Sequence, residues 1–143
     1  MFFILYVSKA SEQCSDVEIA DILRTSRKNN SANGVTGILV YKKPEFFQFL
    51  EGSEESVTAL YEKIKNDTRH ELIKTISQGE TDDRIFPNWE MGFAGEGDLQ
   101  PLQWKWDLDK LTLFSLAENM DDSMEVIRAF IDHQPLDKNS PHT

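Results

Sequence analysis

The alternation of short apolar runs with helical stripes constrains this chain most strongly. Residues 2–7, 35–41 and 46–50 are runs of branched and aromatic side chains that are too short for ordinary helices and are typical of strands. Residues 16–30 carry apolar side chains at helical spacing, and so does a segment that opens at Gly52-Ser53. The pattern therefore predicts strand, helix, a strand hairpin and a second helix.

Two further runs, residues 72–77 and 89–93, complete the order as two more strands. The first six elements match the βαββαβ, or ferredoxin-like, pattern. In that pattern two crossover helices cover one face of the sheet. We therefore expect an α+β fold with a fifth strand in a mixed sheet.

Length and charge limit the domain organisation. The 143 residues suit one domain, and 15 basic against 25 acidic side chains give a net charge of −10. Such a charge argues against binding nucleic acid through its phosphates. We expect a core at residues 1–93, a helical segment at 94–133 and a disordered tail at 134–143. An apolar stripe in the second segment (Met124, Ile127, Phe130 and Ile131) suits the sheet face opposite the two helices.

Most templates for catalysis and metal binding are missing from the sequence. There is no glycine-rich phosphate loop, and His70, His133 and His142 are scattered, so we expect no metal site. Cys14 is alone in a polar loop, and no apolar run is long enough to span a membrane. We expect a cytoplasmic protein that does not bind membranes.

Four polar residues stand where apolar ones are expected: Tyr6 in the first strand, Ser26 and Asn30 on the inner stripe of the first helix, and Gln48 within Phe46–Leu50. A buried polar group without a partner costs about 1 to 3 kcal/mol. Each could be satisfied within the protein, with Tyr6 as a core aromatic, Gln48 bonded to an edge backbone and Asn30 near a helix end. Together they indicate a ligand.

Several motifs resemble the BLUF family, the sensors of blue light using FAD, from Met1 to about Phe93. The matching segments are LYVS at 5–8, SRKNN at 26–30, GVTGILVY at 34–41, FFQFLEG at 46–52, Asp67-x-Arg69-His70 and Phe86-x-x-Trp89-x-Met91. The turn at residues 42–45 departs from the family, which often has a glycine there.

The resemblance implies FAD, with FMN or riboflavin as substitutes, held between the two helices. It assigns the photoactive roles to Tyr6 and Gln48. Asn30 is implied to bond the carbonyl edge of the flavin ring, and Ser26 to line the ring. The other implied flavin contacts are Asn29, Lys63, Asp67, Arg69 and His70.

The chemistry of the pair suits such a role. Tyrosine is oxidisable and has a transferable proton, and a carboxamide that rotates or tautomerises inverts the hydrogen bonds it offers. Trp89 and Met91 fall on one face of the expected fifth strand, where either could contact Gln48 and pass on its rearrangement. Core packing is an equally good interpretation of Trp89.

We therefore expect a photoreceptor without enzymatic turnover. The 50 residues after Phe93 are fewer than a cyclase or phosphodiesterase domain needs, so output is expected through a protein partner. A homodimer or higher homo-oligomer is also expected. The alternatives are a small flavin-dependent oxidoreductase and a cofactor-free ferredoxin-like interaction module.

Overall fold

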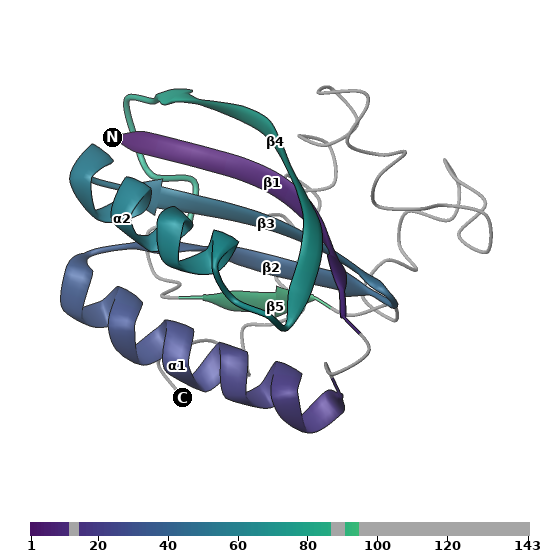
Figure 1. The fold of residues 1–143 in the computed structure, drawn as a ribbon. Helices are drawn as coiled ribbons and strands as arrows, with labels where there is room; N and C mark the ends of the chain where they lie inside the picture. The colour runs from purple at the N-terminus through teal and green to yellow at the C-terminus, as the bar shows by residue number, and fades with distance from the viewer. Residues whose placement is uncertain (12–14, 87–90, 95–143) are drawn as a thin grey trace, which may run out of the picture.

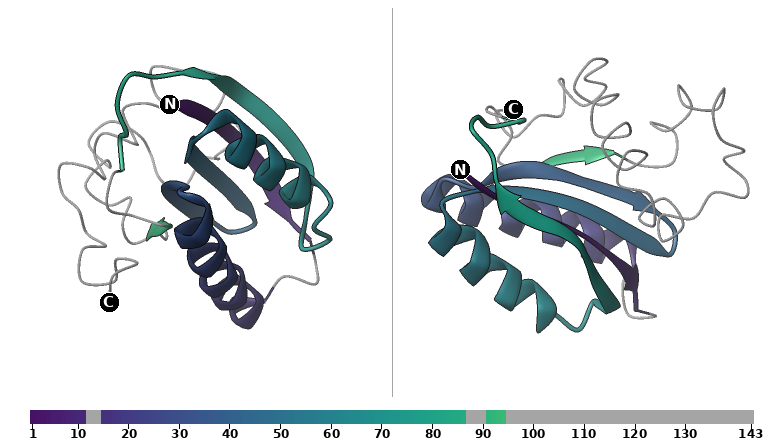
Figure 2. Two further views of the ribbon diagram at one scale, coloured as in Figure 1. Left: turned by 90° about the vertical axis from the view of Figure 1, so that its left-hand side faces the viewer. Right: turned by 90° about the horizontal axis from the view of Figure 1, so that it is seen from above.

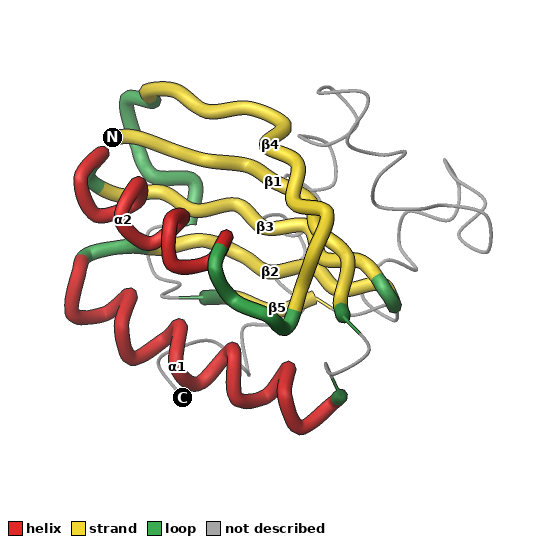
Figure 3. Tube along the Cα trace, viewed as in Figure 1, coloured by secondary structure: helices red, strands yellow, loops and turns green. Residues whose placement is uncertain are grey.

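The structure is a computed structural model, and it describes residues 1–11, 15–86 and 91–94. This part of the chain forms two helices and five strands (Figure 1, Figure 3). In chain order they are β1 (Phe2–Ala10), α1 (Asp16–Asn33), β2 (Thr36–Lys42), β3 (Glu45–Gly52), α2 (Glu54–Lys65), β4 (His70–Glu80) and β5 (Gly92–Ala94).

The strands form one mixed sheet in the order β4-β1-β3-β2-β5. Neighbouring strands are antiparallel except β2 and β5, which run parallel. Both helices lie on the same face of this sheet, as the two views of Figure 2 show. The predicted α+β ferredoxin-like fold with a fifth strand is therefore confirmed.

Local sequence sets the helix ends. Ser15 and Ser53 cap the two N-termini, each accepting a hydrogen bond from a backbone N–H in the first turn of its helix. Gly34 ends α1 in a left-handed conformation (φ 69°), which glycine adopts without steric cost. The chain then enters β2 directly.

The pairing of β1 with β3 places Tyr6 opposite Gln48. Directly opposed residues of an antiparallel pair project from the same face, so the two side chains are neighbours. On the other side of β3, Gly37 of β2 approaches so closely that a Cβ there would lie 1.9 Å from the carbonyl oxygen of Phe49. Only glycine fits at this close approach of the β2 and β3 backbones.

Alternation along the strands builds two buried layers. The layer under the helices contains Ile4, Tyr6, Leu39, Phe46 and Leu50 from the strands, Val35 just before β2, and Ile19, Val57 and Tyr61 from the helices. The opposite layer contains Leu5, Val7, Ile38, Val40, Phe47 and Phe49, and all six are at most 1% exposed. β1 is therefore buried on both faces of the sheet along most of its length.

All five strands differ in their bounds from the sequence prediction, and the differences at β4 and β5 matter most for the site. β4 is longer than the expected 72–77, because it pairs with β1 from Ala10 back to Phe2. β5 begins at Gly92, so Met91 precedes the strand and the two-residue alternation expected to place it does not apply. Trp89, the segment 94–133 beyond its first residue and the tail 134–143 lie outside the described residues.

Candidate functional site

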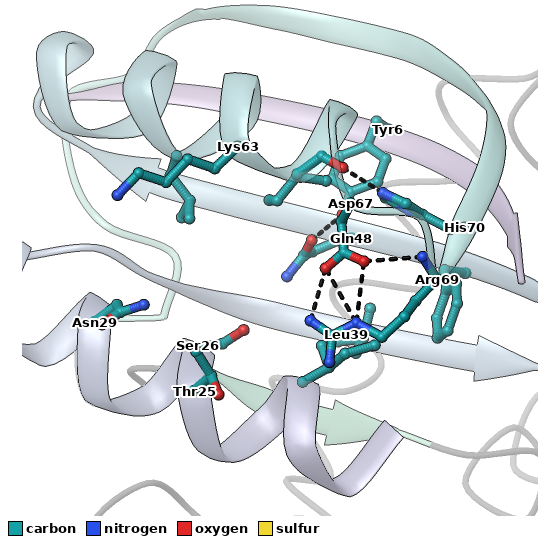
Figure 4. A pocket seen from close by; sticks show the side chains of 14 residues that line it. Tyr6, Thr25, Ser26, Asn29, Leu39, Gln48, Lys63, Asp67, Arg69 and His70 are labelled. Atoms are coloured by element: carbon teal, nitrogen blue, oxygen red, sulfur yellow. Dashed lines mark hydrogen bonds and ion pairs between the residues drawn. The ribbon is translucent and has the colours of Figure 1, made fainter. Parts of the chain in front are cut away.

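A cavity of about 230 Å³ lies between α1 and α2 on the helix side of the sheet (Figure 4). Both helices, four strands and the connection from α2 to β4 contribute to its walls. The lining residues are Tyr6, Ile22, Thr25, Ser26, Asn29, Leu39, Phe46, Gln48, Leu60, Lys63, Ile64, Asp67, Arg69 and His70.

Tyr6, Gln48 and Met91 form a buried hydrogen-bonded chain at this cavity. The Tyr6 hydroxyl donates to Oε1 of Gln48, and Nε2 of Gln48 donates to the sulfur of Met91 at 3.3 Å. The three residues are 3%, 4% and 0% exposed, respectively. Both arms of the amide are therefore engaged, and rotating the amide by half a turn would exchange its donor and acceptor.

The surroundings of Tyr6 keep its phenol protonated. Burial raises its pKa well above the ordinary value of 10.0, and the neighbouring Tyr61 and Asp67 raise it further. The Tyr61 ring lies 5.2 Å from the Tyr6 ring, and the hydroxyl of Tyr61 shares a hydrogen bond of 2.5 Å with that of Thr75. Tyr6 is therefore a hydrogen-bond donor to Gln48 at any ordinary pH.

His70 links two elements of the cavity wall through hydrogen bonds. Its Nε2 lies 2.5 Å from the carbonyl oxygen of Ile64, and its Nδ1 lies 2.9 Å from the hydroxyl of Ser8. Because a carbonyl oxygen only accepts, Nε2 carries the proton. The ring thus joins the end of α2 to β1.

Asp67 and Arg69 form a charged group at one end of the cavity (Figure 4). Arg69 donates to both carboxylate oxygens of Asp67, at 2.6 Å from its terminal nitrogen. These bonds hold the pKa of Asp67 below its ordinary value of 3.8 and raise that of Arg69. Arg69 also pairs with Asp21 of α1 at 3.1 Å.

Most of the helix residues that the resemblance implied as flavin contacts line the cavity, and one does not. Ser26 and Asn29 line the cavity, and Lys63 lines it from α2. Asn30 is 1% exposed but is not among the lining residues, and its backbone carbonyl accepts from Gly34 and Val35. The structure thus brings Tyr6, Gln48 and six of the seven implied flavin contacts to one cavity.

The sequence did not identify six lining residues, namely Ile22, Thr25, Leu39, Phe46, Leu60 and Ile64. All but Thr25 are apolar, and apolar periodicity does not distinguish a cavity wall from a filled core. A link from Arg27 to Met91 was also missed, because the Nε of Arg27 donates to the Met91 carbonyl oxygen at 3.0 Å across 64 residues of sequence.

A second buried polar group lies at Glu51 on the opposite face of β3. Its carboxylate accepts from the backbone N–H of Ile85 at 2.8 Å and of Phe86 at 2.6 Å, and from the Thr36 hydroxyl at 3.3 Å. Burial raises the pKa of Glu51 even though these bonds and nearby Arg84 oppose the change. Glu51 therefore anchors the chain shortly before Met91.

The cavity suits a planar aromatic ligand with polar edges. Aliphatic side chains project from both helices, Ile22 from α1 and Leu60 and Ile64 from α2, while amides, hydroxyls and charged groups stand beside them. Within the described residues, no group of His, Cys, Asp and Glu could hold a metal ion. Neither of the two described helices has the length and apolarity needed to cross a membrane.

Comparisons with known proteins point to one family. The family described as "BLUF: Sensors of blue-light using FAD" matches residues 1–92. The beta subunit of photoactivated adenylate cyclase from Euglena longa is 34% identical over 90 residues, or 62% of this chain, and the alpha subunit from Euglena gracilis is 33% identical over 90 residues. The match spans 10% and 9% of the length of these relatives, respectively.

Solved structures agree with this assignment. BlrB, a BLUF protein in its dark state, has a TM-score of 0.81 at 29% identity, covering 92% of this chain and 96% of its own. BlsA in its photo-activated state has a TM-score of 0.81 at 28% identity, covering 91% of this chain and 94% of its own. A bacterial light-regulated adenylyl cyclase has a TM-score of 0.68 at 33% identity, covering 90% of this chain and 36% of its own. The chain belongs to the BLUF family, the sensors of blue light using FAD.

Proposed function

We propose that this chain is a blue-light photoreceptor that binds FAD noncovalently between α1 and α2 and has no enzymatic turnover of its own. The observation that carries the proposal is the buried chain from Tyr6 through Gln48 to Met91 at the edge of the cavity. The light-responsive names of the relatives support it. Ser26, Asn29, Lys63, Asp67, Arg69 and His70 would hold the flavin, with Asn30 beside them.

Bound FAD would supply absorption of blue light and, once excited, a one-electron oxidant. Tyr6, which keeps its proton in the resting protein, would give an electron and its phenolic proton to the cofactor and then take both back. During that exchange Gln48 is released from its bond to Tyr6 and settles with its donor and acceptor arms rearranged. The new arrangement shifts the absorption band to longer wavelength and reverts thermally in the dark.

The absorption spectrum before and after blue light tests the proposal. We expect a yellow protein whose whole flavin band moves to the red without bleaching. A colourless protein would favour a cofactor-free interaction module. Bleaching that persists, or reduction by a nicotinamide, would favour a small flavin-dependent oxidoreductase.

The signal is proposed to leave through residues 94–133 to a protein partner, within a homodimer or higher homo-oligomer. Gln48 bonds Met91, which directly precedes β5, so its rearrangement has a short covalent route toward this segment. Segment 98–131 is proposed to cover the sheet face opposite the helices. Hydrogen exchange of the full chain in light and darkness tests this route for the signal. Identical protection of residues 98–131 in both states, together with light-dependent assembly that survives truncation after Gly97, would contradict it.

A further inference from the structure

Arg69 links the two walls of the cavity. Its guanidinium lies 2.6 Å from the carboxylate of Asp67, in the connection between α2 and β4, and 3.1 Å from that of Asp21 on α1. A third carboxylate, Glu18 of α1, lies 3.8 Å away. One cation is thus shared by acids from both sides of the cavity.

The two shorter ion pairs, Arg69 with Asp67 and Arg69 with Asp21, join different parts of the chain. Asp67 and Arg69 are two residues apart, so their pair stays formed even when the walls move. Asp21 and Arg69 are 48 residues apart, and their pair joins α1 to the connection between α2 and β4. Asp21 does not line the cavity, whereas Arg69 and Asp67 do. An effect of Asp21 on a ligand must therefore pass through Arg69.

α1 is attached to the sheet side of the molecule through side chains. Ile19 lies in the core under the helices, and Arg27 bonds the Met91 carbonyl oxygen. Among the described elements, the backbone of α2 approaches β1 and β3 more extensively than α1 approaches any of them. Figure 1 shows α1 near β5 and α2 on the side of β1 and β3. The pair of Asp21 with Arg69 is therefore a direct link between α1 and the connection from α2 to β4.

We infer that Asp21 is a positioning residue, which holds Arg69 against the cavity and ties α1 to the connection between α2 and β4, so that bound flavin leaves slowly. The inference rests on the proposed flavin site. The pair is partly exposed, with 42% of the Asp21 side chain and 24% of the Arg69 side chain accessible. An ion pair of this kind changes a rate by roughly two- to fivefold.

The test measures release of riboflavin from the full chain by the recovery of its fluorescence. Riboflavin carries no phosphate, so the protein's net charge does not steer it. Asp21→Asn is expected to release it about two- to fivefold faster, and Asp21→Glu to restore slow release. High salt should bring the wild-type rate toward that of Asp21→Asn, because salt screens exposed pairs.

Glu62→Gln is the matched control. It removes one negative charge and an exposed ion pair with Lys65 on α2, yet Glu62 does not line the cavity. The inference is wrong if Asp21→Asn releases riboflavin no faster than Glu62→Gln, or if Asp21→Glu behaves like Asp21→Asn.

Hydrogen exchange of the flavin-free proteins adds a readout that needs no ligand. Asp21→Asn should lower protection in the first turns of α1 and in residues 66–70, and equal protection in both proteins would also overturn the inference. Wild-type protein that binds no riboflavin would instead refute the proposed flavin site, while the exchange experiment would still decide whether Asp21 ties the walls.

Discussion

The two faces of the sheet are built from the same strands but carry opposite properties. On the helix side, Tyr6 and Gln48 face each other across β1 and β3 beside a cavity. The next opposed pair, Val7 and Phe47, is fully buried in the opposite layer. Alternation thus places a polar pair beside a cavity on one face and an apolar pair in a filled layer on the other.

Aromatic contacts show the same difference. On the filled side, Phe49 stacks on Phe3 at 5.6 Å and meets Phe86 edge-on at 5.9 Å, and none of these rings has a polar atom. On the cavity side, Tyr6 and Tyr61 are 5.2 Å apart and both hydroxyls are hydrogen-bonded. Substitutions at adjacent positions of one strand are therefore expected to alter the proposed photochemistry and the stability separately.

The strongest way to test that separation is to change neighbours on β3. Gln48→Leu should keep the flavin but abolish the light-induced red shift, because the side chain loses both its donor and its acceptor. Tyr6→Phe should do the same. Phe49→Leu, one residue from Gln48 on the filled side, should retain the full shift. Difference spectra after blue light measure all three variants, and a normal shift in Gln48→Leu would refute the mechanism.

The free energy of unfolding should depend more on Phe49 than on Tyr6. Phe49→Ala is expected to lower the free energy of unfolding by about 3 to 5 kcal/mol, since it empties space between two other rings. Tyr6→Phe removes one hydrogen bond and should cost about 1 kcal/mol. Urea unfolding of the flavin-free proteins measures both values. Equal losses would show that the two sides are not specialised.

Two carboxylates should give the two regions opposite dependences on pH. The pKa of Asp67 is lowered, so the stability that it contributes is present above its ordinary value of 3.8 and is lost as pH falls through the lowered pKa. The pKa of Glu51 is raised, so stability declines as pH rises from its ordinary value of 4.5 toward the raised one.

Each slope is at most about 1.4 kcal/mol per pH unit, the limit for a single proton. The unfolding midpoint of each variant should be measured as a function of pH. Asp67→Asn should lack the loss of stability at low pH, and Glu51→Gln should lack the decline above pH 4.5. Retention of the decline above pH 4.5 in Glu51→Gln would assign it to another group.

A smaller effect is expected from the hydrogen bond between Arg27 of α1 and Met91. Arg27→Met keeps the aliphatic chain but removes the hydrogen bond to the Met91 carbonyl oxygen. The loss of about 1 kcal/mol should change the rate of dark recovery by up to roughly fivefold without removing the red shift. Recovery followed at one wavelength measures it, with Lys28→Met as the control, because Lys28 is the next residue of α1, carries the same charge and is exposed. Identical recovery in both variants would show that this bond does not affect the switch.

Local patterns predicted the order of the helices and strands, because alternation and helical stripes are local properties. Contacts between residues far apart in the sequence could not be predicted in this way. Glu51 directly follows the apolar run 46–50, yet it is buried because backbone groups 34 and 35 residues later bond to it. The pairing of Arg69 with Asp21 depends likewise on how α1 is placed.

The length of β4 was underestimated for a related reason. This edge strand has many exposed positions, and its polar side chains obscure the alternation that marked the others. Its extent is set by β1, with which it pairs along nearly the whole strand. Met91 reached the predicted partner Gln48 although it lies outside the strand expected to carry it.

The register of β1 against β3 has a consequence for how this protein matures. Sliding one strand by a single residue would send Tyr6 and Gln48 to opposite sides of the sheet. A chain trapped in that arrangement could still be compact, but it would have no switch. The proposed light-induced colour change would therefore report correct pairing of β1 with β3, and it could be read in a living cell without unfolding the protein.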